Sequence, residues 1–106
     1  MSKIIVANFK MNGTKSFIKN WLNKFLEEKN ISNEVIVALP MPYLALFSNY
    51  DISIAAQNVS SSDSGSFTSQ VSARMLKDCG IDYSIIGHSE SRNLLNETNE
   101  DIFSKY

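Results

Sequence analysis

The 106-residue chain contains few of the residues that define several protein classes. It has one cysteine, Cys79, and one histidine, His88, so we expect neither an internal disulfide nor a structural zinc site. Ten Lys and Arg against eleven Asp and Glu give a net charge of −1. This balance leaves no broad basic field for a nucleic acid or an anionic membrane, so any bound anion must be held by a local site.

Long hydrophobic runs are also missing. The apolar run near the start of the chain, Ile4 to Ala7, is shorter than the core of a signal peptide. No run approaches the roughly 18 residues that a membrane-spanning helix needs. Together with the single cysteine, which favours a reducing compartment, these absences predict a cytoplasmic protein.

The chain does have enough apolar material for a core. Hydrophobic residues make up 43% of the sequence and aromatic residues 10%, with four Gly and two Pro, so neither disorder nor a collagen-like structure is expected. A length of 106 residues is typical of one domain. We therefore predict a single domain over residues 1–106.

Four short segments rich in β-branched and small apolar residues are predicted to be strands. None alternates strictly between apolar and polar residues, which is typical of parallel strands that are covered on both faces. The segments are residues 3–8, 34–39, 51–57 and 82–87.

Segments of helical periodicity lie between these strands. Thr14 is the expected N-cap of an amphipathic helix whose apolar residues are Phe17, Ile18, Trp21, Leu22, Phe25 and Leu26. A short helix is expected near Pro42. A third helix is predicted from about Thr68 to Gly80, with an apolar stripe of Val71, Met75, Leu76 and Cys79.

A fourth helix is predicted to begin at Thr98, because Thr98 and Asp101 have the spacing of a capping box. Ile102, Phe103 and Tyr106 should start its buried stripe. The alternation of strand and helix predicts an α/β fold with four parallel strands. Since the sequence stops about two turns into this helix, we expect the chain to be truncated within it.

Polar side chains follow the predicted strands where each of them ends. The carboxyl ends of parallel strands meet at one edge of a sheet, where loops and helix N-termini converge, so these side chains are expected to form one site. They are Asn8 and Lys10 after the first strand, Gln57 and Asn58 after the third, and His88, Ser89 and Glu90 after the fourth.

Two of these segments resemble one known family. Residues 8–14 (Asn-Phe-Lys-Met-Asn-Gly-Thr) and 85–92 (Ile-Ile-Gly-His-Ser-Glu-Ser-Arg) resemble the first and fourth loops of triosephosphate isomerase, in the same order. Residues 55–58 and 64–68 resemble its third strand and third loop. A complete (β/α)₈ barrel takes about 250 residues, so the resemblance implies the N-terminal half of such a barrel.

The resemblance implies interconversion of dihydroxyacetone phosphate and glyceraldehyde 3-phosphate through an enediolate, in glycolysis and gluconeogenesis, without cofactor or metal. His88 would be the electrophile, a neutral imidazole that donates to the substrate carbonyl. Lys10 would stabilise developing negative charge, and Asn8 would orient the substrate. Glu90 would tune Lys10, and Ser89 would contact the catalytic carboxylate.

Each of these side chains also has a structural interpretation. Asn8 could form a turn at a strand end, and Lys10 could be a solvated loop lysine. Glu90 could be a first-turn residue favoured by the helix dipole, and Ser89 could cap the helix. We expect Gln57 and Glu97 to be structural rather than catalytic.

The third loop departs from the family pattern. Thr68-Ser69-Gln70 stands where the family has Thr-Gly-Glu, and Ser91 stands where it often has Arg. In the family this loop, which includes Thr68, inserts into the partner subunit of a homodimer, and the Glu and Arg pair across the interface. Both charges are absent here, which argues against a dimer locked by charge but not against the chemistry.

The resemblance also implies residues that these 106 do not contain: the glutamate base, the mobile lid and the later phosphate-binding loops. We therefore expect the chain alone to be nearly inactive, because no group removes the carbon-bound proton. The alternative is a non-catalytic half-barrel that self-associates or assembles with a partner through its open strand edges.

Overall fold

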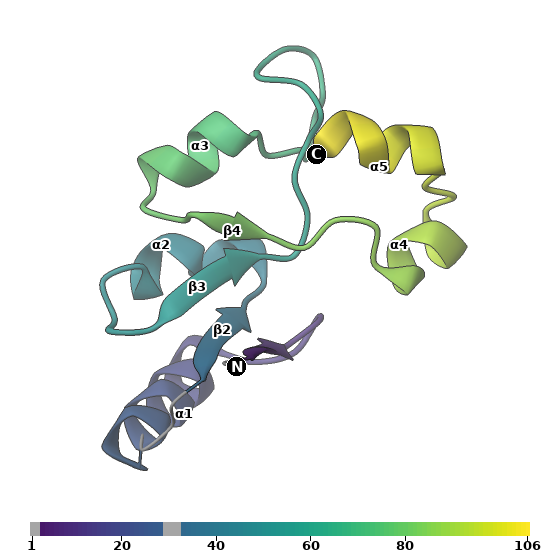
Figure 1. Cartoon of the computed structure of the whole chain (residues 1–106). Helices are drawn as coiled ribbons and strands as arrows, with labels where there is room; N and C mark the ends of the chain where they lie inside the picture. Colours follow the sequence, from purple (N-terminus) through teal and green to yellow (C-terminus); the bar gives the residue numbers. More distant parts are fainter. Residues whose placement is uncertain (1–2, 29–32) are drawn as a thin grey trace.

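The computed structural model describes residues 3–28 and 33–106; the rest of the predicted domain range lies outside the described residues. Four parallel strands form one sheet in which each strand lies beside the next along the chain (Figure 1). They are β1 (Ile4–Asn8), β2 (Glu34–Ala38), β3 (Ser53–Ala56) and β4 (Tyr83–Ser84). The predicted α/β fold is confirmed, and its strand order is that of the first half of a (β/α)₈ barrel.

Strand β4 is shorter than the predicted segment 82–87. It pairs with β3, through Ala55 with Tyr83 and Ala56 with Ser84, and with no other strand of the described residues. Gly87 has a φ of +66°, a left-handed conformation that takes the chain out of the sheet before His88. The residues that follow Ser84 therefore form the approach to the next helix rather than more strand.

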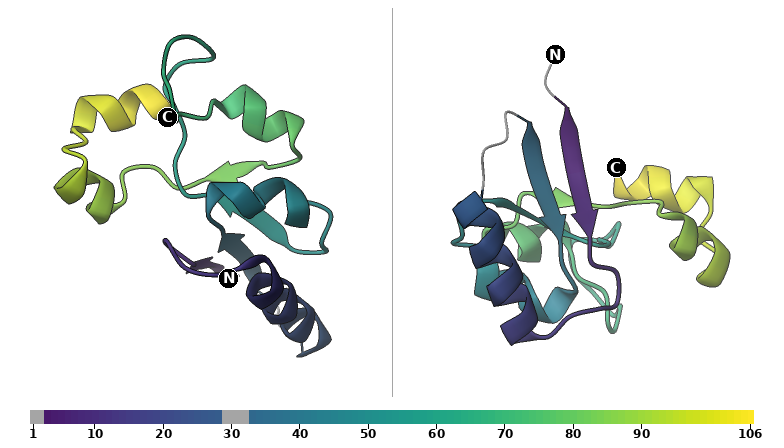
Figure 2. Two further views of the ribbon diagram at one scale, coloured as in Figure 1. Left: turned by 180° about the vertical axis from the view of Figure 1, so that it is seen from behind. Right: turned by 90° about the horizontal axis from the view of Figure 1, so that it is seen from below.

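Helices cover one face of the sheet (Figures 1 and 2). They are α1 (Lys15–Glu28), α2 (Leu44–Phe47), which continues from the 3₁₀ turn η1 (Met41–Tyr43), and α3 (Ala73–Asp78). Pro42 lies in the first turn of η1, as predicted. The buried side chains between helices and strands form the main core, which includes Ile18, Leu22, Val37, Leu39, Leu44, Phe47, Ile54 and Leu76.

The opposite face of the sheet carries only a small cluster of Ile36, Ala38 and Ala55, with Ile85 packed against it. On β1 the side chains of Ile4 and Val6 are 65% and 49% exposed. The expectation that all four strands are covered on both faces is therefore wrong for β1. The exposure follows from the position of β1 at the edge of the sheet, since Ile5, on the helix-covered face, is also 45% exposed.

Helix α1 begins as predicted. The backbone N–H of Phe17 donates to Thr14 Oγ1 (3.2 Å), which makes Thr14 the N-cap. Ile18 and Leu22 are fully buried, and Trp21 packs against the core. Phe17, predicted to share the apolar face, is 55% exposed and meets only Phe9 edge-on among the described aromatic rings, whereas its neighbour Ile18 in the same turn enters the core.

Helix α3 begins at Ala73, five residues after the predicted start at Thr68. Ser72 is its N-cap and accepts a hydrogen bond from the Met75 N–H (3.2 Å). Gly80, with a φ of +81°, ends the helix as predicted. Because α3 has less than two turns, only Leu76 of the predicted stripe is both helical and buried. The predicted stripe is wrong at Met75 and Cys79, because both side chains are exposed.

Ser69 accounts for the late start of α3. Its φ is +76°, a conformation that costs a residue with a side chain about 1 kcal/mol more than glycine. We expect Ser69→Gly to raise the free energy of unfolding by about this amount, measured by denaturant unfolding. Ser66→Gly, at a position with negative φ in the same loop, is the matched control and should give no gain. Equal effects of the two changes would contradict this assignment.

Two further helices follow β4, beside the carboxyl ends of the strands (Figure 1). Helix α4 (Ser89–Leu94) lies in the stretch 88–96, for which periodicity predicted no helix, because its residues form no apolar stripe. Helix α5 (Asn99–Lys105) has the predicted capping box at Thr98 and Asp101. Its predicted stripe is wrong at Phe103 and Tyr106, which are almost fully exposed.

The capping box of α5 should make this helix sensitive to acid. A hydrogen bond from the Thr98 backbone holds the pKa of Asp101 below its ordinary value of 3.8. A lowered pKa gives stability that is complete above the ordinary pKa and is lost as the pH falls through the lowered value. We expect the helical Cα chemical shifts of residues 99–103 to decline over that pH range. Asp101→Asn should remove this step; the same step in both proteins would contradict the prediction.

Candidate active site

The predicted site residues do lie at the carboxyl edge of the sheet. Asn8 is the last residue of β1, and Lys10 follows in the loop that leads to α1. His88 is the N-cap of α4, in the segment that leaves β4. These side chains come from opposite edges of the sheet, and only the parallel strand order brings them to the same end.

The Glu90 carboxylate lies between the side chains of Lys10 and His88. One carboxylate oxygen lies 3.1 Å from the Lys10 ammonium, and the other lies 3.6 Å from His88 Nδ1. The side chains of Lys10 and Glu90 are about half exposed, so their ion pair contributes about 0–1 kcal/mol to stability. The contact therefore adds little to the stability of the fold.

His88 caps α4 with its ring. Its Nδ1 accepts a hydrogen bond from the Glu90 backbone N–H (3.0 Å). A ring nitrogen that accepts carries no proton, so in this arrangement the imidazole is neutral and its proton is on Nε2. Ser89, which could have been the cap, is instead the first residue of the helix and is exposed. The structural interpretation of Ser89 as the N-cap is therefore wrong.

The backbone of Lys10 has an uncommon conformation. Its φ is +56°, in the left-handed region. Its N–H donates to Asn8 Oδ1 (2.9 Å), so Asn8 forms a turn at the end of β1, as its structural interpretation predicts. Gln57 donates from Nε2 to the Lys10 carbonyl (2.8 Å). The sequence indicated only that Gln57 lies at this edge, not that it contacts Lys10.

Thr68 lies apart from these residues, in the loop over residues 58–72 between β3 and α3. This loop projects from the sheet (Figure 1), and Thr68 is exposed on it. Ser60 closes the base of the loop: its N–H donates to Val71 O (2.8 Å), and its hydroxyl donates to Gln70 Oε1 (2.8 Å). Gln70 is thus used within the loop, where the family has a glutamate.

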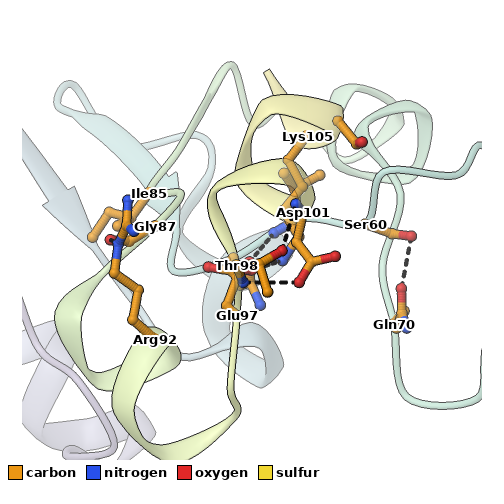
Figure 3. A network of polar contacts seen from close by, with 12 residues as sticks. Ser60, Gln70, Ile85, Gly87, Arg92, Glu97, Thr98, Asp101 and Lys105 are labelled. Carbon is orange, nitrogen blue, oxygen red and sulfur yellow. Dashed lines mark hydrogen bonds and ion pairs between the residues drawn. The ribbon is translucent and has the colours of Figure 1, made fainter.

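A cavity of about 580 Å³ lies between this loop and α5. Figure 3 shows a network of polar contacts that includes five residues of its lining, namely Ser60, Gln70, Glu97, Asp101 and Lys105. The Lys105 ammonium pairs with Glu97 Oε2 and donates to Asn58 Oδ1 (2.9 Å). Neither Lys10 nor His88 lines this cavity. The ion pair joins the end of α5 to the segment before it, and the hydrogen bond to Asn58 connects α5 to the loop after β3.

The described part of the chain offers no group of three or more His, Cys, Asp or Glu side chains that could hold a metal ion. Among the same residues, no helix has both the length and the apolar character needed to cross a membrane.

Comparison with known proteins identifies the family. The family model for triosephosphate isomerase matches residues 3–106. The chain belongs to the triosephosphate isomerase family. The four strands of the sheet are accordingly the first four strands of the barrel, and Asn8, Lys10 and His88 follow the first and fourth of them.

Curated relatives agree with this assignment. Triosephosphate isomerase of Wolbachia sp. subsp. Brugia malayi is 43% identical over an alignment of 105 positions that covers 96% of this chain and 44% of the relative. Triosephosphate isomerase of Francisella philomiragia subsp. philomiragia is 37% identical over an alignment of 111 positions that covers 99% of this chain and 44% of the relative. The chain thus spans less than half the length of these relatives.

Proposed function

We propose that this chain supplies the first half of a triosephosphate isomerase site, which interconverts dihydroxyacetone phosphate and glyceraldehyde 3-phosphate in glycolysis and gluconeogenesis. The observation that carries the proposal is the Glu90 carboxylate, which has the Lys10 ammonium on one oxygen and the His88 ring near the other, in a chain of this family. We also propose a cytoplasmic location and a reaction without cofactor or metal.

In this proposal His88 polarises the substrate carbonyl. The neutral ring donates from Nε2–H to the carbonyl oxygen as negative charge grows there, and it then moves protons between the two oxygens of the enediolate. The Lys10 ammonium stabilises the same charge from the other side. Asn8, which fixes the Lys10 N–H, orients the substrate through its remaining amide group.

Glu90 makes two contacts in the proposed site, one with its side chain and one with its backbone. It holds the Lys10 ammonium while its own backbone N–H fixes His88 Nδ1. A substrate oxygen that approaches Lys10 competes with this carboxylate, so Glu90 tunes how readily the ammonium turns to the substrate. Ser89, exposed beside it, is available to contact the catalytic carboxylate of a complete barrel.

The carbon-bound proton must go to a base, and none of the residues placed here takes that role. We therefore propose that the chain alone is nearly inactive and that turnover needs the later strands of the barrel. Joining this chain to the unmatched remainder of the Wolbachia relative and assaying isomerisation tests the proposal. Turnover in the joined protein, absent from either part alone, is the expected result. A folded joined protein without turnover would overturn it.

The proposed enzyme is a homodimer in which the loop that carries Thr68 contacts the partner. Gln70 and Ser91 stand where the family often has a charged pair, and Gln70 is already bonded to Ser60. Because these two residues carry no charge, the dimer of the joined protein should be nearly insensitive to salt.

A second candidate function is a non-catalytic half-barrel that self-associates. It is favoured by the apolar side chains exposed on the edge strand β1 and on the C-terminal helices, among them Ile4, Val6, Leu94 and Phe103. Analytical ultracentrifugation of the 106-residue chain tests it. A concentration-dependent oligomer supports self-association, whereas a monomer with sharp thermal unfolding contradicts it.

A further inference from the structure

We propose that Gln57 is a positioning residue: it holds Lys10 in its left-handed backbone conformation and thereby places the Lys10 ammonium beside Glu90. The inference rests on the proposed function, in which that ammonium meets the substrate. A side chain that follows β3 would thus set the position of the Lys10 ammonium, which belongs to the loop after β1.

The contacts of Gln57 are centred on Lys10. Its Nε2 donates to the Lys10 carbonyl at 2.8 Å, while Asn8 Oδ1 and the Ala38 carbonyl lie farther away, at 3.4 and 3.5 Å. The N–H of Lys10 is bound in turn by Asn8 Oδ1 at 2.9 Å. Both polar groups of the Lys10 backbone are thus fixed by side chains from two different strand ends.

Such a tether is needed because the left-handed conformation is unfavourable for a residue with a side chain. Lys10 has a φ of +56°, and its Cβ makes this conformation less favourable than it would be for glycine. If the carbonyl were released, φ would relax toward an extended value and the Cα–Cβ bond would turn away from its present direction. The four-carbon side chain would carry the ammonium with it.

The side chain of Lys10 has little else to hold it. It is half exposed, and within the described ranges 3–28 and 33–106 its ammonium makes one ion pair, with the half-exposed Glu90. Contacts of this kind are weak and do not fix a long flexible side chain. The direction in which the backbone presents the side chain therefore decides where the ammonium lies.

The test compares Gln57→Met with Gln70→Met in the 106-residue chain, by NMR. Methionine has nearly the size of glutamine but cannot donate to the Lys10 carbonyl. Gln70 is the matched control, since its side chain bonds Ser60 and not Lys10. Three signals are followed: the strong intraresidue HN–Hα cross-peak of a left-handed Lys10, cross-peaks between Lys10 Hε and Glu90 Hγ, and the affinity for added dihydroxyacetone phosphate.

Gln57→Met is expected to weaken the first two signals and to lower the affinity by about tenfold, the worth of one good hydrogen bond. Gln70→Met should leave all three unchanged. Retention of both Lys10 signals in Gln57→Met overturns the proposal, and so does their loss without any loss of affinity. If Gln57→Met does not fold, Gln57→Glu, of the same size but without the donor, takes its place with the same expectations.

The same experiment separates this proposal from the proposed function. If the unaltered chain does not bind dihydroxyacetone phosphate, the proposed function fails for this chain. The contact between Lys10 and Glu90 in Gln57→Met then decides alone whether Gln57 positions the ammonium: its loss supports the positioning role, and its retention refutes it.

Discussion

Replacing His88 by glutamine in the barrel completed with the remainder of a relative is expected to lower kcat by about 10² to 10⁴. Glutamine can still donate one hydrogen bond to the substrate carbonyl, but it cannot pass a proton between the two oxygens of the enediolate. The loss should therefore fall mainly on kcat rather than on KM. Steady-state kinetics of the isomerisation measures both.

His88 also caps α4, so the structural part of the change must be separated from the chemical part. Asparagine at position 88 is a good N-cap but, like glutamine, lacks the ring. His88→Asn should therefore keep the thermal stability of the completed barrel and lose as much kcat as His88→Gln. Full activity in either variant would remove His88 from the mechanism.

Replacing Lys105 by methionine is expected to loosen α5 from the rest of the structure by about 3 kcal/mol. The side chains of Lys105 and Glu97 are only 14% and 7% exposed. Glu97 Oε1 is buried and has no hydrogen-bond partner among the described residues, so Lys105 is the main support of this carboxylate. Without Lys105 the charge of Glu97 is buried and unpaired.

Amide hydrogen exchange in α5 measures this effect, and the expected increase in rate is about 100-fold or more. Lys77→Met is the matched control. Lys77 pairs with Asp82 at 2.6 Å, but both side chains are largely exposed, and about 0.5 kcal/mol or less is expected from its loss. Lys105→Met combined with Glu97→Leu should recover most of the stability. Equal effects of the two lysine changes would contradict the assignment.

Local signals in the sequence predicted the parts of the fold that local chemistry determines. Thr14 and Thr98 cap their helices because the side-chain oxygen of each accepts a hydrogen bond from the N–H three residues farther along the chain. The strand segments were found because a parallel sheet needs runs of β-branched residues. The alternation of strands and helices predicted a parallel sheet, whereas the order β1-β2-β3-β4 was implied only by the resemblance to a barrel family.

The exposure of apolar residues could not be predicted in the same way. Periodicity shows which side chains share a face, but not whether anything covers that face. Met75, Phe103 and Val6 all have the right spacing or neighbours for burial, and all are substantially exposed. This chain spans less than half the length of its relatives. Whether an apolar face is covered depends on how the whole barrel packs, and these segments alone do not determine it.

The candidate site was predicted at the level of residues but not of contacts. Motifs indicated Lys10, His88 and Glu90, yet nothing in the sequence said that one carboxylate would lie between the ring and the ammonium. The contact between Gln57 and the Lys10 carbonyl was missed because it joins residues 47 positions apart through a backbone group. Sequence motifs carry no information on such backbone acceptors.

The central claim, that Lys10 and His88 act on the same small molecule, is tested most directly by an NMR titration of the 106-residue chain with dihydroxyacetone phosphate. The imidazole signals of His88 and the Hε signals of Lys10 are recorded at each concentration. We predict that both sets move together and give one dissociation constant. If only one set moves, or if the two give different constants, the two side chains do not share a ligand and the account is wrong.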